Sequence, residues 1–192
     1  MALLTEKEVR SRARTQTSAR GKTARVLVME SASTKEETFD VFLSHARVDE
    51  ELVLGVKLLL EDARKRVYID WIDDPLLDRA NVTPQTARDL RKRMNQSASL
   101  MYLFTPSAKR SNWMPWELGY FDGANGNVAV LPVLSATSDG FTGHEFVGLY
   151  PYVDFTRLTP TSAPSVYVHR SAGEYLTFDV WQQGAEKLRP GV

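Results

Sequence analysis

The stretch Phe39-Asp40-Val41-Phe42-Leu43 decides the fold class of this chain, because it is short and almost wholly apolar. A run of this kind predicts a strand that is buried on both faces. The apolar residues that follow recur at the spacing of a helix. They are Leu52, Val53, Val56, Leu59, Leu60 and Ala63. A buried strand followed by a helix is the repeating unit of α/β proteins.

Four further apolar runs predict strands that lie beside the first one. They are residues 67–69, 100–104, 128–133 and, more weakly, 150–153. Strands of this kind that alternate with helices form a mostly parallel sheet covered on both faces. In such sheets, ligands bind outside the carboxyl ends of the strands, where the strand order reverses. This rule points to three segments, residues 44–46, 70–83 and 105–117.

Helix signals lie between the strands. Thr83-Pro84 predicts a helix start, with threonine as the N-cap and proline at the first helical position. A second helix is predicted from Asn112 to about Gly123, capped by Ser111 or Asn112. We expect a last helix from Tyr175 to Leu188, in which three apolar side chains pack against the rest of the domain. They are Leu176, Val180 and Trp181.

Composition excludes several classes of protein. The 192 residues carry no net charge, so we expect neither a nucleic acid nor an anionic membrane as partner. The absence of cysteine excludes a disulfide framework, a cysteine-ligated zinc site and a thiol nucleophile. No apolar run reaches the roughly 18 residues that a membrane-spanning helix needs. We expect a cytoplasmic protein.

The beginning of the chain differs from the rest. Residues 1–29 hold seven Lys or Arg against two Glu, with Ser and Thr between them. We predict a basic arm over residues 1–36, flexible or partly helical, with a short helix around Leu4–Ala13. The simpler interpretation is a solvated arm, and the alternative is an arm for oligomerisation or partner binding. A domain with a C-terminal extension would then span residues 37–192.

Trp113 and Glu117 are the most informative pair. They are four residues apart and therefore share one face near the start of their helix. A carboxylate beside a large aromatic ring can hold an electron-poor sugar against that ring. The alternative is that Trp113 and Trp116 belong to the core and that Glu117 is an exposed acid that complements the helix dipole.

Two motifs together resemble TIR (Toll/interleukin-1 receptor) domains. Residues 39–46 with Asp49 are similar to the opening motif of this family, and Trp113-x-x-x-Glu117 resembles the tryptophan-to-glutamate motif of its NAD-degrading members. Residues 118–123 and 130–133 are similar to the stand-alone bacterial members of the anti-phage (Thoeris-like) type. The resemblance covers roughly residues 39–155.

The resemblance implies a flavodoxin-like TIR fold whose five-stranded, mostly parallel sheet has the strand order 2-1-3-4-5. It implies an NAD glycohydrolase or ADP-ribosyl cyclase, with Glu117 as the catalytic carboxylate and Trp113 against the substrate. NAD is then the substrate, and no cofactor is expected. Self-association through the loop 72–83 and a phage-derived trigger are implied as well. The alternative is a non-catalytic TIR adaptor that acts by self-assembly.

Five further residues at the predicted ligand edge are candidates for substrate binding. Ser44 and His45 end the first strand, where they contact the nucleotide or cap the backbone. Asp70 and Trp71 close the second strand, and Trp71 is a stacking wall or a core residue. Ser111 lies at the start of the glutamate helix.

The histidines give no sign of a metal site. His45, His144 and His169 are dispersed along the chain, so the sequence predicts no metal cluster. We expect His144 and His169 to be isolated surface residues.

Overall fold

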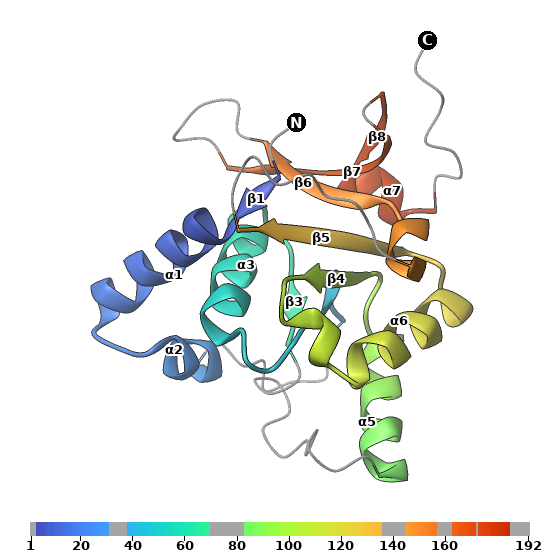
Figure 1. The fold of residues 1–192 in the computed structure, drawn as a ribbon, viewed down its shortest axis with the longest axis horizontal. Coiled ribbons are helices and arrows are strands. Elements are labelled where there is room, and N and C mark those ends of the chain that lie inside the picture. Colours follow the sequence, from blue (N-terminus) through green and yellow to red (C-terminus); the bar gives the residue numbers. More distant parts are fainter. Residues whose placement is uncertain are drawn as a thin grey trace.

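The computed structural model describes residues 3–30, 38–69, 83–135, 145–156, 163–171 and 173–184. Its strands and helices alternate through most of the chain (Figure 1). The strands are β1 Leu4–Thr5, β2 Val41–Ser44, β3 Val67–Tyr68, β4 Leu100–Phe104, β5 Val128–Leu134, β6 Tyr152–Thr156, β7 Ser165–Ser171 and β8 Glu174–Thr177. The helices are α1 Glu6–Arg20, α2 Ala24–Glu30, α3 Glu50–Asp62, α5 Pro84–Asn95, η1 Ala108–Arg110, α6 Trp113–Ala124, η2 Glu145–Leu149 and α7 Phe178–Gln182.

One sheet carries the fold, in the order β3-β2-β4-β5-β6-β7-β8, with β1 paired to β5. The five strands from β2 to β6 are parallel. Numbered along the chain, they follow the order 2-1-3-4-5, which confirms the predicted topology. The prediction of five strands is wrong in number, because β1, β7 and β8 join the same sheet.

Helices cover both faces of the sheet. Residues of α1, α2 and α3 pack with the aliphatic side chains of one face. Residues of α5, α6 and η2 pack on the other face, where many rings are buried. Figure 1 shows the two groups on opposite sides of the strands. The start of α5 follows the prediction, because Thr83 accepts a hydrogen bond from the Thr86 N–H and Pro84 is the first helical residue.

The N-terminal helix is longer than expected and is packed rather than solvated. α1 extends to Arg20, and Val9 and Ala13 are fully buried in it. A capping box begins the helix, because the Thr5 side chain accepts from the Glu8 N–H and the Glu8 carboxylate accepts from the Thr5 N–H. α1 packs against α3, while the preceding strand β1 extends the sheet along β5. The proposed domain boundary after residue 36 lies outside the described residues and stays a prediction.

The C-terminal region differs from the expected helix over residues 175–188. Tyr175 and Leu176 lie in β8, which pairs antiparallel with β7, and only Phe178–Gln182 are helical. The free edge of β7 supplies backbone hydrogen bonds to this segment, so the sheet outweighs its helical side-chain pattern. Residues 185–188 of the predicted helix lie outside the described part. No helix among the described residues has the length and apolar character that crossing a membrane requires.

Candidate functional site

A buried carboxylate marks the carboxyl edge of the sheet. Glu117, in the second turn of α6, has no exposed surface, and neither has Ser44, the last residue of β2. The Ser44 hydroxyl donates a hydrogen bond of 2.6 Å to Glu117 Oε2. The two residues are 73 positions apart in sequence, so the fold brings them together. Both residues therefore lie at the carboxyl edge of the sheet, and their contact with a ligand stays a prediction.

The start of α6 explains why Glu117 points inward. The Ser111 hydroxyl accepts a hydrogen bond from the Met114 N–H, which satisfies a donor of the first turn. Met114, Leu118 and Phe121 fix the buried face of the helix, and Glu117 lies on that same face. A carboxylate buried there costs free energy unless it is hydrogen-bonded. The interpretation of Glu117 as an exposed acid is wrong.

Trp113 has a core position beside this carboxylate. Only 8% of its surface is exposed, and its ring meets that of Trp116 edge-on at 5.3 Å. The ring belongs to the aromatic cluster beneath α6. Burial agrees with the interpretation of Trp113 as a core residue. Its contact with a substrate stays a prediction.

His45 is fixed by the backbone. Its Nδ1 lies 2.7 Å from the Leu43 carbonyl oxygen, and the ring is buried. Because a carbonyl oxygen only accepts, Nδ1 carries the proton in this contact. The backbone-capping role of His45 is therefore present, and a nucleotide contact stays a prediction.

Of the remaining candidates for substrate binding, the structure describes only Ser111. Asn112 is the N-cap residue of α6, and the hydroxyl of the preceding Ser111 accepts from the first turn, so any contact with substrate is a second role for that hydroxyl. Asp70 and Trp71 lie outside the described residues, as does the loop 72–83 except for Thr83. Their predicted roles stay predictions. Among the described residues, no group of three or more His, Asp or Glu side chains could hold a metal ion.

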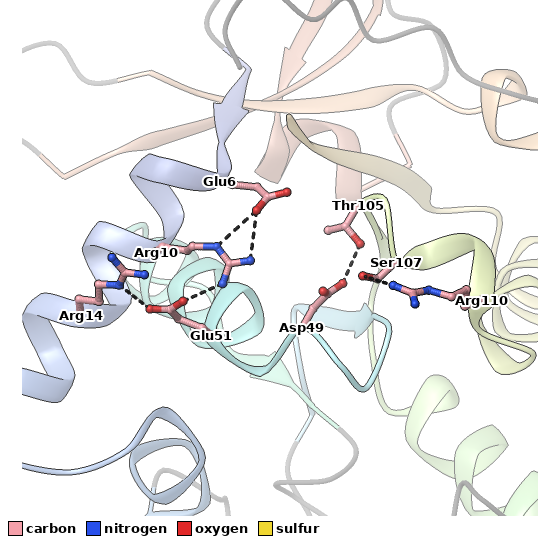
Figure 2. A network of polar contacts seen from close by, with 8 residues as sticks. All are labelled: Glu6, Arg10, Arg14, Asp49, Glu51, Thr105, Ser107 and Arg110. Atoms are coloured by element: carbon pink, nitrogen blue, oxygen red, sulfur yellow. Dashed lines mark hydrogen bonds and ion pairs between the residues drawn. The ribbon is translucent and has the colours of Figure 1, made fainter. Parts of the chain in front are cut away.

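A second buried hydrogen bond ties together two loops at the same edge. The Thr105 hydroxyl, just after β4, donates to Asp49 Oδ2 at 2.7 Å (Figure 2). Both residues are buried, and Asp49 directly precedes α3. This bond fixes the loop after β2 against the loop after β4. The edge on which Ser44 and Glu117 meet is therefore pre-organised by a contact between side chains far apart in sequence.

Tyr102 and a neighbouring pocket were not predicted from the sequence. Tyr102 lies in β4, where its apolar neighbours made it look like an ordinary core residue. Burial, with a smaller effect from the charge of Glu117, raises the pKa of the Tyr102 hydroxyl. Tyr102 also lines a pocket of about 330 Å³ between β4, η1, α6 and η2. The other lining residues are Phe104, Ala108, Lys109, Pro115, Phe146 and Val147.

His169 is buried rather than on the surface, which corrects the expectation for this residue. Its Nε2 lies 3.1 Å from Asp154 Oδ1, although the two atoms are not aligned for a hydrogen bond. The ring stacks on Tyr152 at 5.3 Å, because the two residues are cross-strand partners in β6 and β7. This pair lies in strands outside the Ser44–Glu117 site. His144 lies outside the described residues.

Comparison with known proteins identifies the family. The model of the TIR domain family matches residues 41–165. The chain belongs to the TIR domain family. The match spans β2 to the first residue of β7 and includes Ser44, Trp113 and Glu117. It confirms the resemblance inferred from the two sequence motifs and the predicted fold class.

Two named proteins are similar to this TIR chain. A protein of Bacillus cereus (strain MSX-D12), named "Probable 3' cyclic ADP-D-ribose synthase ThsB'", is 42% identical over 150 residues, which cover 78% of each chain. A Cytobacillus dafuensis protein, named as a candidate cyclic ADP-D-ribose synthase TIR2, is 29% identical over 86 residues. That match covers 44% of this chain and 23% of the other protein.

A solved structure is also similar. It is the TIR domain of the Toll-related receptor TRR-2 from Hydra magnipapillata, with 19% identity and a TM-score of 0.45. The similarity covers 60% of this chain and 82% of that one.

Proposed function

We propose that this TIR chain cleaves the nicotinamide–ribose bond of NAD and converts the rest of the molecule into a cyclic ADP-ribose. The observation that carries the proposal is Glu117, a carboxylate fully buried at the carboxyl edge of the sheet and hydrogen-bonded to Ser44. The name of the 42% identical relative supports the same activity. A non-catalytic adaptor would have no use for a buried carboxylate at this place.

The chemistry needs one negative charge near the ribose. When nicotinamide leaves as a neutral molecule, the ribose becomes an oxocarbenium-like cation, as in glycoside hydrolysis. Glu117 would stabilise this cation from a fixed position, and no acid is needed for the leaving group. The Ser44 hydroxyl would hold the carboxylate in orientation. Trp113 would supply a flat wall against which nicotinamide or ribose lies.

The capture step decides the product. If a hydroxyl of the same molecule attacks the cation, a ring closes and that hydroxyl loses its proton. If water attacks, linear ADP-ribose and a proton result. We propose that the cyclic product acts as a signal in bacterial anti-phage immunity, with a phage-derived trigger, as the resemblance implies.

Mass spectrometry of the products after incubation with NAD tests the activity. We expect nicotinamide with a cyclic ADP-ribose in wild-type protein and a loss of about 100-fold or more in Glu117→Gln, because the amide keeps the shape and removes the charge. Asp122→Asn is the matched control, since Asp122 is an exposed carboxylate on the same helix. Turnover of Glu117→Gln at the wild-type rate would contradict the role of Glu117. Wild-type protein that releases no nicotinamide at any concentration would contradict the activity.

We also propose that activity depends on self-association through the segment 72–83. The sequence predicts a loop over these twelve residues, and predicted loops of this length are typically binding elements or lids. Fixing such a loop at each binding event would cost conformational entropy. A neighbouring subunit that holds the segment in advance would remove that cost. Specific activity should then rise with protein concentration as light scattering reports larger species. Constant specific activity from a monomer over the whole range would contradict this proposal.

A further inference from the structure

The pocket beside Tyr102 lies on the other side of α6 from the proposed catalytic carboxylate. Pro115 lines the pocket, whereas Glu117 is two residues later, which turns it by about 200° around the helix. Tyr102 connects the pocket with the carboxylate, since it lines the pocket and the charge of Glu117 helps to raise the pKa of its hydroxyl. The pocket and the carboxylate therefore flank the first turns of one helix, at the same edge of the sheet.

The described lining of the pocket combines aromatic rings with the positive charge of Lys109. Tyr102, Phe104 and Phe146 supply three aromatic rings, and Lys109 supplies an ammonium group. Among the residues that the structure describes, no carboxylate lines the pocket. Rings of this kind stack on a nucleobase, and a lysine binds a phosphate as a point charge. Phe146 is 39% exposed, so a ligand that covers it removes apolar surface from water.

The size of the pocket limits what it can hold. Its volume of about 330 Å³ is near the lower end of the range for pockets that bury a small ligand, about 300–1,000 Å³. It is therefore suited to one end of a dinucleotide rather than to a whole one. A substrate whose ribose lies at Glu117 would have its other end within reach, because only the first turns of α6 separate the two places.

We propose that this pocket holds the adenosine end of NAD, with the adenine among Tyr102, Phe104 and Phe146 and a phosphate beside Lys109. The proposal rests on the proposed NAD cleavage for its substrate. It adds residues that determine specificity to a site otherwise defined by Glu117, Ser44 and Trp113. In this arrangement the pocket contributes binding and leaves the bond-breaking step to the carboxylate.

Binding of adenosine 5′-monophosphate, measured by calorimetry, tests the pocket independently of any catalysis. Phe146→Ala should weaken this binding by about 5- to 150-fold, the range that one ring–base stack contributes. Leu149→Ala is the matched control, because Leu149 lies in the same short helix, is 79% exposed and does not line the pocket. Lys109→Ala should also weaken the binding of adenosine 5′-monophosphate. Arg110→Ala is its control, because Arg110 is a neighbouring cation that does not line the pocket, and its removal should leave this binding unchanged.

Kinetics then separate the two proposals. In Phe146→Ala, the KM for NAD should rise by about tenfold with kcat nearly unchanged, since the lost contact is made equally before and during the reaction. Nicotinamide mononucleotide lacks the adenosine end, so its cleavage or binding should be unaffected by the variant. Absent binding of adenosine monophosphate, or equal binding by wild type and Phe146→Ala, would overturn the pocket proposal even if NAD is cleaved. An unchanged KM for NAD would overturn it too, while absent NAD cleavage with normal nucleotide binding would overturn only the activity.

Discussion

The two faces of the sheet differ in chemistry. The face under α5, α6 and η2 is rich in rings and contains the fully buried Glu117. The face under α1 and α3 is mostly aliphatic, and its acids and bases meet at the rim between the two helices. Figure 2 shows that rim, with Arg10 between Glu6 and Glu51. One face therefore bears a buried carboxylate at the carboxyl edge of the sheet. The other face is mostly aliphatic packing with ion pairs at its rim, and its buried Lys57 in α3 is paired with Glu61, a half-exposed residue of the same helix.

This difference suggests a division of roles. A buried carboxylate lowers stability unless its environment compensates for it, and strain of this kind gathers at functional sites. Aliphatic packing and rim ion pairs raise stability and require no special chemistry. Variants on the aromatic face should therefore change activity more than stability. Variants on the aliphatic face should do the reverse.

Gly55→Ala should give the largest effect on the aliphatic face. A Cβ at this position would lie 2.2 Å from the Val9 carbonyl oxygen and 2.6 Å from Val9 Cγ1, so α1 must move away from α3. We expect the free energy of unfolding to fall by about 3 kcal/mol, at the upper end of the cost of overpacking. Urea unfolding measures this loss, and cleavage of NAD per folded molecule should stay at the wild-type level.

Gly119→Ala, on the aromatic face, is the matched control for this variant. Gly119 lies inside α6, and a Cβ there would meet no atom within 4 Å. Alanine should stabilise the helix by up to about 1 kcal/mol, because glycine is the poorer helix former. If both variants lost the same amount of stability, the close approach of α1 and α3 could not be the reason for the loss in Gly55→Ala.

Ser44→Ala tests the aromatic face. The variant removes the hydroxyl that donates to Glu117 Oε2, so the carboxylate loses orientation and a buried acceptor loses a donor. We expect kcat for NAD to fall by about tenfold with little change in KM, and the free energy of unfolding to fall by about 1–3 kcal/mol. Ser44→Thr keeps the hydroxyl and should recover most of kcat. A wild-type kcat in Ser44→Ala would contradict the role of this hydrogen bond in orienting the carboxylate.

The strands and helices from β2 to β6 could be predicted because their signals are local. Each strand is an apolar run, and α5 begins with a threonine cap and a proline. Glu117 and Ser44 could be proposed for the same reason, since each lies in a short motif. Their hydrogen bond could not, because it joins residues that are 73 positions apart.

The two ends of the chain were predicted less well, for different reasons. The signal for α1 was present in the sequence, as Thr5 and Glu8 form a capping box and Val9 and Ala13 are four residues apart. The basic composition of this segment favoured a solvated arm, because two of the acids that pair with its arginines are distant in sequence. Glu51 lies 41 residues after Arg10, and Asp62 lies 50 residues after Arg12. In β7, Val166 and Val168 face the core while Tyr167 and His169 share the other face. That alternation over a few residues was too short to separate a strand from a loop.

Charged side chains from α1 and α3 meet at the rim of the aliphatic face. Arg10 and Arg14 each lie 2.7 Å from an oxygen of Glu51. Burial raises the pKa of Glu51, but the hydrogen bonds from Arg14 and Arg10 outweigh burial and lower the pKa below its usual value. The folded-state pKa is therefore below the unfolded one, about 4.3. The contribution of Glu51 to stability is complete above that pH and disappears as the pH falls through the folded-state pKa.

Glu51→Gln should accordingly lower the free energy of unfolding by about 1 kcal/mol at pH 7, because the two pairs are partly exposed and solvent weakens them. Urea unfolding at pH 7 and at decreasing pH should show the difference between wild type and variant shrinking below pH ~4.3. Salt should reduce it at pH 7. Glu50→Gln, whose pair with Arg25 is longer at 3.6 Å and more exposed, should change stability less. If the difference in the free energy of unfolding between wild type and Glu51→Gln stayed constant across this pH range, Glu51 would stabilise the protein through packing rather than through its charge. The rim would then be held by packing, as the interior of the same face is.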